Sequence, residues 1–150
     1  VGKTDRTFWT SAVDDYVKRL KYYVKFSILY LPNVKAKKKI NPKEIKSEEA
    51  RLISQKIKVE DVVYLLDEKG KSYTSTGFSK QIEQHMISRT KRIVFVIGGA
   101  YGFTDGLYQK YPKLMCLSKM TFSHQMARLF FCEQLYRAFT IINNHPYHNN

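Results

Sequence analysis

The chain has 150 residues and carries 26 Lys and Arg against 13 Asp and Glu, which gives a formal net charge of +13 at pH 7. A chain of this length buries one core, so we expect a single domain over residues 1–150. The sequence contains no apolar run near the roughly 20 residues that span a bilayer and no charged-then-apolar leader, which favours a cytoplasmic protein without a membrane partner. The positive charge favours a polyanionic partner, nucleic acid above all, over the alternative of a basic but inert surface.

The two cysteines, Cys116 and Cys132, lie in apolar segments and form no Cys-x-x-Cys pair. We therefore expect buried free thiols in a reducing compartment and no disulfide.

Helix-like and strand-like apolar patterns alternate along the chain, starting at Val1-Gly2-Lys3-Thr4, which resembles the end of a first strand whose earlier residues precede Val1. Such alternation, with continuous apolar strands, is typical of an α/β fold with a mostly parallel sheet covered on both faces. In chain order we expect a helix capped at Thr4 or Asp5, a strand over residues 23–31, a basic loop over 35–39, a helix capped at Asn41, a strand over 61–67, a helix capped at Ser75, a strand over 92–97, a short helix opened by Thr104, a strand over 114–117 and a long helix capped at Ser123.

Small or polar residues follow three of the expected strands. Gly98 and Gly99 come directly after the strand over 92–97, where parallel sheets place ligands, although a plain tight turn is the alternative. The turn lacks the Gly-x-Gly-x-x-Gly spacing and a following Walker lysine, so the sequence indicates no dinucleotide or phosphate cradle. Leu66 ends an earlier strand, and residues 118–121 form a polar loop suited to a small ligand.

The last helix and the tail carry the candidate chemistry. Arg137 is costly in so apolar a helix unless it faces an anion or pairs with Glu133 four residues earlier. Tyr147 and His148 suit hydrogen bonding or proton transfer, with a solvated tail as the alternative. His124 fits a site or a structural role equally well. The tail imidazoles have no carboxylate or thiolate at metal spacing, so no metal site is expected.

Six segments spread in order over almost the whole chain carry a family resemblance. They resemble the ribosomal RNA large subunit methyltransferase H family, which belongs to the SPOUT methyltransferases. The segments are Val1-Gly2-Lys3-Thr4, Leu66-Asp67, Ile97-Gly98-Gly99-x-x-Gly102, Leu117-Ser-x-Met120-Thr121-Phe122-Ser-His124-Gln125-Met126-x-Arg128, Glu133-Gln134-Leu135-Tyr136-Arg137-Ala138 and Asn144-His-Pro-Tyr-His148.

The resemblance implies properties that periodicity does not give. It implies an α/β sandwich whose C-terminal part is tied in a trefoil knot, a homodimer with each active site near the subunit interface, and S-adenosyl-L-methionine as methyl donor. The implied reaction methylates N3 of a pseudouridine in large-subunit (23S) ribosomal RNA on the assembled ribosome. The implied cofactor-binding residues are Leu66, Gly98, Leu117, Ser118, Lys119, Met120, Thr121 and Phe122. The resemblance and the side-chain chemistry together give Arg137, Tyr147 and His148 as the first candidates for substrate-site residues. His124 and Arg128 are the second candidates.

Two points stay open at this level. Which of these residues takes the proton from the base is undecided. The alternative function is a non-catalytic RNA- or ribosome-binding protein that uses only its basic surface.

Overall fold

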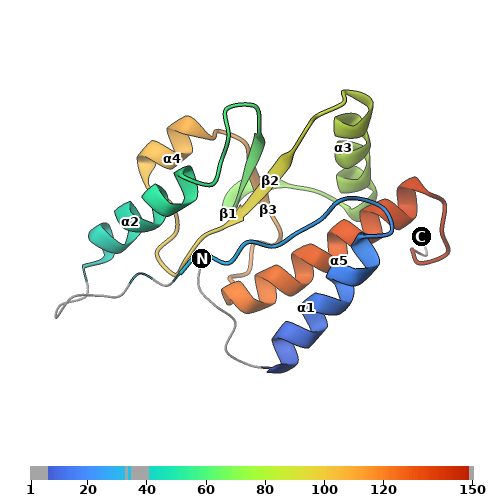
Figure 1. The fold of residues 1–150 in the computed structure, drawn as a ribbon, viewed down its shortest axis with the longest axis horizontal. Coiled ribbons are helices and arrows are strands. Elements are labelled where there is room, and N and C mark those ends of the chain that lie inside the picture. The colour runs from blue at the N-terminus through green and yellow to red at the C-terminus, as the bar shows by residue number, and fades with distance from the viewer. Residues whose placement is uncertain (1–6, 33, 35–40, 149–150) are drawn as a thin grey trace.

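A computed structural model of the chain describes residues 7–32, 34 and 41–148, and Figure 1 shows helices on both sides of a small sheet. The elements are α1 (Thr7–Leu20), α2 (Pro42–Ser54), β1 (Val62–Ser72), α3 (Ser75–Ile87), β2 (Ile93–Ile97), α4 (Asp105–Lys110), β3 (Leu114–Cys116) and α5 (His124–Ile142). The expected strand end at Val1-Gly2-Lys3-Thr4, the expected cap at Thr4 or Asp5, and the basic loop over 35–39 lie outside the described residues.

The sheet has the strand order β2-β1-β3, and both pairings are parallel. Leu66 of β1 pairs with Ile97 of β2 on one side and with Met115 of β3 on the other. After Leu66 the pairing with β3 breaks and resumes at Lys71, which also pairs with Met115, so β1 bulges between these residues. The carboxyl ends of β2 and β3 therefore flank the bulge at one edge of the sheet.

Helices cover both faces of the sheet, which confirms the expected α/β architecture. Alternate β1 residues point to opposite faces: Tyr64 packs under α1, α3 and α5, whereas Val63 and Leu65 pack under α2 and α4. The first core contains Leu20, Tyr64, Phe78, Ile82, Met115, Phe131, Leu135, Ala138 and Phe139, and the second contains Ile53, Val63, Leu65, Val96, Phe103 and Leu107.

Side-chain oxygens cap the helices close to the positions that the sequence indicates. Asn41, Thr104 and Ser123 each accept a hydrogen bond from a backbone N–H in the first helical turn, as expected. The expected cap at Ser75 is wrong by one residue, because Thr74 accepts from the Gly77 N–H at 3.0 Å and Ser75 is already helical.

The expected strand over residues 23–31 is wrong. From residue 25 this segment forms no regular element and joins no described strand, and its apolar side chains pack on the cores: Phe26 on the core under α5 and Leu31 on the core under α2. A strand requires a hydrogen-bonded partner, and apolar content alone does not supply one.

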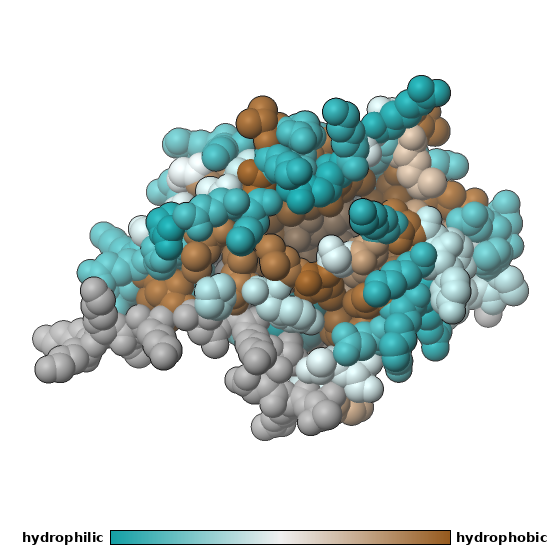
Figure 2. Space-filling view, viewed as in Figure 1, coloured by the Kyte–Doolittle hydropathy of each residue, from teal (hydrophilic) through white to brown (hydrophobic). Residues whose placement is uncertain are grey.

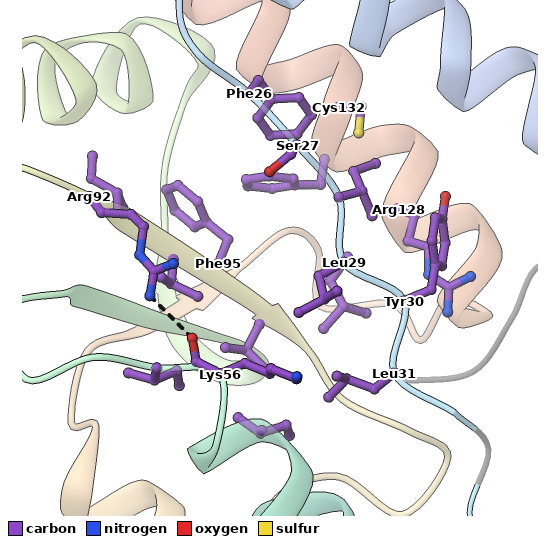
Figure 3. Close-up of a pocket in the computed structure, with 18 of the residues that line it drawn as sticks. Phe26, Ser27, Leu29, Tyr30, Leu31, Lys56, Arg92, Phe95, Arg128 and Cys132 are labelled. Atoms are coloured by element: carbon purple, nitrogen blue, oxygen red, sulfur yellow. Dashed lines mark hydrogen bonds between the residues drawn. The ribbon is translucent and has the colours of Figure 1, made fainter.

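A cavity of about 310 Å³ separates this segment from β2, the edge strand of the described sheet. Figure 2 shows apolar side chains gathered in the hollow, and Figure 3 shows Phe26 and Leu29 on one side of it, Phe95 on the other, and Tyr30 beside Arg128. Of the residues expected in a site, only Arg128 lines this cavity. This cavity is therefore not where the sequence indicates the chemistry.

Both cysteines are buried free thiols, as expected. None of the helices in the described part of the chain combines the length and the hydrophobicity that a bilayer-spanning helix requires.

Candidate active site

Three of the expected ligand-binding segments begin at the same edge of the sheet. Gly98 directly follows Ile97, the β2 residue that pairs with Leu66, and Leu117 directly follows the last residue of β3. Because the strands are parallel neighbours, Leu66, the glycine turn and the loop over 117–122 open on one side of the molecule.

The β1 bulge is held against β3 and the loop that follows it by a side-chain hydrogen bond and a close approach of two backbones. Lys119 donates from Nζ to the Glu68 carbonyl oxygen at 3.2 Å. At Gly70 a Cβ would lie 2.5 Å from the Met115 nitrogen and 2.6 Å from its carbonyl carbon, so only glycine allows this approach. The approach fixes where the loop leaves the sheet.

The loop over 117–122 holds its own shape and keeps several side chains in solvent. The Ser118 hydroxyl accepts a hydrogen bond from the Met120 N–H at 3.0 Å. The side chains of Lys119, Met120 and Thr121 are exposed, and Met120 is 75% exposed. An apolar side chain held so far in water inside a constrained loop is free to contact a ligand.

Behind the glycine turn lies a buried carboxylate that the sequence pattern did not reveal. Glu49 of α2 is 8% exposed and accepts a hydrogen bond from the Gly99 N–H. Burial raises the pKa of Glu49, and the hydrogen bond from Gly99 opposes that rise. A Cβ at Gly99 would overlap this carboxylate, whereas a Cβ at Gly98 would meet the Phe103 ring at 3.1 Å. Both glycines are therefore packed from behind.

The tail folds back onto α5 through a defined helix end. Asn144 adopts φ +54°, its N–H donates to the Ile141 carbonyl at 3.0 Å, and the His145 N–H donates to the Thr140 carbonyl at 2.8 Å. These two bonds form a Schellman motif, for which asparagine is a usual substitute for glycine at the left-handed position. The chain direction reverses here, which brings the last residues back beside α5.

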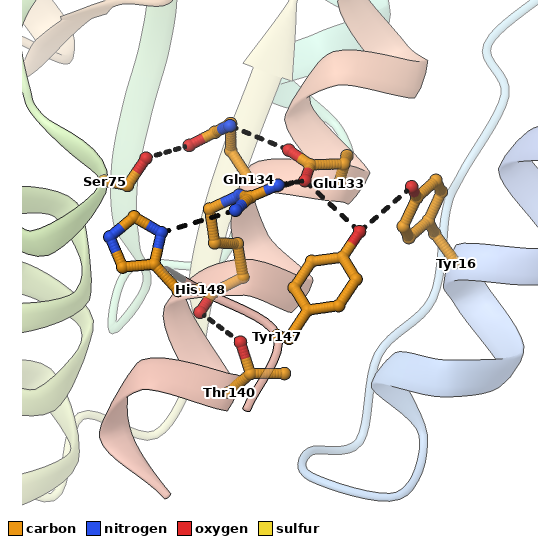
Figure 4. Close-up of polar contacts among 8 residues, drawn as sticks. Tyr16, Ser75, Glu133, Gln134, Thr140, Tyr147 and His148 are labelled. Atoms are coloured by element: carbon orange, nitrogen blue, oxygen red, sulfur yellow. Dashed lines mark hydrogen bonds and ion pairs between the residues drawn. The ribbon is translucent and has the colours of Figure 1, made fainter. Parts of the chain in front are cut away.

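Arg137, Tyr147 and His148 meet in one polar cluster with Glu133 (Figure 4). Arg137 forms an ion pair with Glu133 at 2.5 Å, and its Nη1 lies 3.3 Å from His148 Nδ1. The Arg137 guanidinium also lies 4.9 Å from the centre of the Tyr147 ring. The salt bridge considered from the sequence therefore exists, and it aims the guanidinium at the tail.

The contacts constrain the protonation of two of these groups. Arginine only donates, so His148 Nδ1 accepts from Arg137 and a neutral His148 carries its proton on Nε2. The Tyr147 hydroxyl lies 3.4 Å from both Glu133 Oε1 and the Tyr16 hydroxyl. Burial first, and then the hydrogen bond with Tyr16, raises the pKa of Tyr147. Tyr147 therefore keeps its proton at neutral pH and serves as a donor.

His124 does not join this cluster within one chain. It begins α5, 13 residues before Arg137, which at 1.5 Å per residue places it about 20 Å away along the helix axis. Burial and the nearby Arg128 lower the pKa of His124. Arg128 is itself buried, with its guanidinium 5.2 Å from the centre of the Tyr30 ring. The loop and the tail thus lie at opposite ends of α5, as Figure 1 shows.

Two further contacts of the cluster escaped sequence reasoning. Tyr16, in the apolar stripe of α1, contacts the Tyr147 hydroxyl, and Ser75 of α3 donates to Gln134 at 2.9 Å. The sequence offers no signal for such contacts, because the partners are 59 or more residues apart. Within the described ranges, no group of three or more His, Cys, Asp or Glu side chains could hold a metal ion.

Comparison with known proteins decides the family. Residues 1–148 match the family model described as "Predicted SPOUT methyltransferase". The chain belongs to this family.

Several curated relatives of this SPOUT methyltransferase share one name. The chain is 48% identical over 149 residues to the ribosomal RNA large subunit methyltransferase H of Flavobacterium johnsoniae, covering 99% of this chain and 95% of the relative. It is 46% identical to the protein of that name from Christiangramia forsetii and 44% identical to that from Porphyromonas gingivalis, with the same coverage. The suspected family resemblance is therefore confirmed.

Proposed function

We propose that this SPOUT methyltransferase methylates ribosomal RNA of the large subunit, and that the methylated atom is N3 of a pseudouridine in 23S RNA on the assembled ribosome. Family membership and the name shared by relatives at 44–48% identity support the general reaction. The net charge of +13 suits an RNA substrate. The observation that carries the proposal is that three segments matching the family's motif lie at one edge of the sheet: the bulge of β1 after Leu66, the turn after β2 and the loop after β3. Leu66 itself does not end its strand, as the sequence had indicated, because β1 continues past the bulge to Ser72.

S-adenosyl-L-methionine is the methyl donor in this proposal. Leu66, Gly98 and the loop residues Leu117, Ser118, Lys119, Met120, Thr121 and Phe122 would hold it. The local structure is compatible with such a ligand, because Gly98 carries no side chain and directly follows β2, and the loop exposes both polar groups and the Met120 side chain. When bound, the cofactor supplies a methyl group already activated on a sulfonium.

The chain's own residues would handle the base. The imide N–H must lose its proton before N3 becomes a nucleophile, and Arg137 would stabilise the resulting negative charge. Tyr147, which keeps its proton, would donate a hydrogen bond to a carbonyl of the base. Of the tail residues, His148 is then the better proton acceptor, acting after its Nδ1 contact with Arg137 loosens or through a water.

We further propose that the active site is completed by a second copy of the chain. The loop over 117–122 and the Arg137 cluster lie at opposite ends of a 19-residue helix. A homodimer would place the tail of one subunit beside the loop of the other. The trefoil knot and a cytoplasmic location belong to the same proposal and are supported by family membership.

Calorimetry with S-adenosyl-L-methionine tests the cofactor site. The wild type should bind at micromolar concentrations, a range typical of enzyme ligands, and Gly98→Arg should not bind. Gly106→Arg is the matched control, because nothing lies within 4 Å of a Cβ at Gly106. A folded wild type that does not bind, or equal binding by Gly98→Arg, contradicts the assignment.

Mixing two inactive variants tests the composite site. Gly98→Arg should inactivate the cofactor-binding part of the site, and Arg137→Ala should inactivate the substrate-binding part. If each site uses both subunits, random re-association should restore about a quarter of wild-type activity, since half of the dimers would be mixed and each would hold one intact site. No recovery after verified subunit exchange would show that both halves must lie on one chain.

Mass spectrometry of ribosomal RNA from cells with and without the gene tests the substrate. Loss of a methylated pseudouridine from large-subunit RNA is expected. An unchanged nucleoside profile favours the alternative of a non-catalytic RNA- or ribosome-binding protein, which also predicts salt-sensitive RNA binding that is indifferent to the cofactor and to Arg137→Ala.

A further inference from the structure

Tyr23 forms the shortest contact between the body of the protein and the tail. It follows α1, and its hydroxyl lies 2.6 Å from Nδ1 of His145. The two residues are 122 positions apart in the chain, and their ring centres are 5.7 Å apart. This contact is shorter than those that join the tail to Tyr16, Glu133 or Arg137.

Tyr23 is itself held in place by the core. Its ring stacks on Phe139 with centres 5.9 Å apart and meets the edge of Tyr136 at 6.0 Å. Burial, and then Tyr136, raises the pKa of Tyr23, so its hydroxyl keeps its proton. His145 is exposed, and its backbone carbonyl accepts from the Tyr147 N–H at 2.8 Å. Tyr23, which is packed on the core, thus contacts the exposed His145, and the His145 carbonyl holds the Tyr147 backbone.

We infer that Tyr23 is a positioning residue for the substrate site: by holding His145 it fixes the turn over 145–148, so that Tyr147 and His148 face Arg137. This inference rests on the proposed methylation of RNA. Tyr23 touches neither substrate nor cofactor in this role. It acts through the tail, at the end of α5 opposite the cofactor loop.

Neighbouring tyrosines provide a matched pair of variants. Tyr23→Phe removes one oxygen and keeps the ring packing, whereas Tyr22→Phe makes the same change on a side chain that is 88% exposed. A single hydrogen bond contributes 0.5–1.5 kcal/mol, so Tyr23→Phe should lower kcat between about twofold and tenfold. Its KM for S-adenosyl-L-methionine should equal that of the wild type, and Tyr22→Phe should change neither constant.

Two additional variants separate positioning from a general loss of structure. In an Arg137→Ala background, Tyr23→Phe should cause little further loss, because the group that the tail must face is gone. His145→Ala should lower kcat about as much as Tyr23→Phe, and the double variant should be no worse than either. Additive losses, or a rise in the KM for the cofactor, would overturn the inference.

Nuclear magnetic resonance of the histidine rings gives a readout that does not need activity. The chain has four histidines, so the ring signals can be assigned by substitution. Tyr23→Phe should shift the signals of His145 and His148, whereas Tyr22→Phe should leave them unchanged. If the wild type does not methylate RNA, the proposed function fails, and these spectra still decide whether Tyr23 orders the tail. Unmoved signals, or equal kcat for the two variants of an active enzyme, reject the positioning role.

Discussion

A methyl group added at Gly70 should distort the edge of the sheet that carries the proposed cofactor site. The Cβ of Gly70→Ala would lie 2.5–2.7 Å from backbone atoms of Leu114 and Met115. No rotamer change relieves an overlap with backbone, so β1 and β3 must separate locally. Overpacking a core typically costs about 1–3 kcal/mol, and we expect the upper end here, about 3 kcal/mol.

Urea and thermal unfolding measure this cost. For a chain of this size 1 kcal/mol corresponds to about 2–4 °C, so Gly70→Ala should lower the melting temperature by about 6–12 °C at fixed protein concentration. Gly106→Ala is the control, because it lies in α4 with open space around it and should be neutral or stabilising by up to about 1 kcal/mol. Equal unfolding midpoints for Gly70→Ala and the wild type would refute the claimed close approach of β1 and β3.

Three other predictions follow from single side chains. Tyr108 donates a hydrogen bond to Asp67 at 2.6 Å, and burial together with this contact raises the pKa of Tyr108 to about 12. The stability that this hydroxyl contributes should therefore be complete below pH 10 and lost as the pH approaches 12. Ultraviolet titration of the wild type against Tyr108→Phe measures this, and a hydroxyl that titrates near pH 10 would contradict it. Burial raises the pKa of Cys132 to about 12, so a thiol reagent at pH 8 should react with Cys132 only after the protein unfolds. Rapid labelling of Cys132 in the native protein would show that this thiol is not buried. Glu133→Gln removes the ion pair with Arg137 and should lower the methyl-transfer rate about tenfold while cofactor binding stays unchanged. Transfer of labelled methyl groups to RNA measures the rate, and a wild-type rate would show that the ion pair does not orient Arg137.

The family, and the order of the elements from α2 onward, could be predicted from the sequence. Helix starts at Asn41, Thr104 and Ser123 are local events, because a side-chain oxygen caps a backbone N–H two or three residues away. Continuous apolar strands between helices indicated the parallel sheet, since such strands are buried on both faces. The reaction itself came from resemblance to a family, not from periodicity or charge.

Tertiary structure decided which distant residues meet. The run over 23–31 has strand-like composition, yet its packing against two cores and the absence of a described strand beside it left it outside the sheet. Glu49 occupies an ordinary helix position in the sequence, and only folding places it under Gly99. Tyr23 and His145 could not be paired from a sequence in which 122 positions separate them.

The candidate site illustrates the same division. Resemblance to the family and side-chain chemistry together gave Arg137, Tyr147 and His148 as a set, whereas the local pattern alone left a salt bridge and a solvated tail as alternatives. Folding separated His124 from that set, since a straight 19-residue helix keeps its two ends apart. Capping and other interactions between near neighbours follow from the local sequence, whereas contacts between remote segments depend on how the helices and strands pack around a common core.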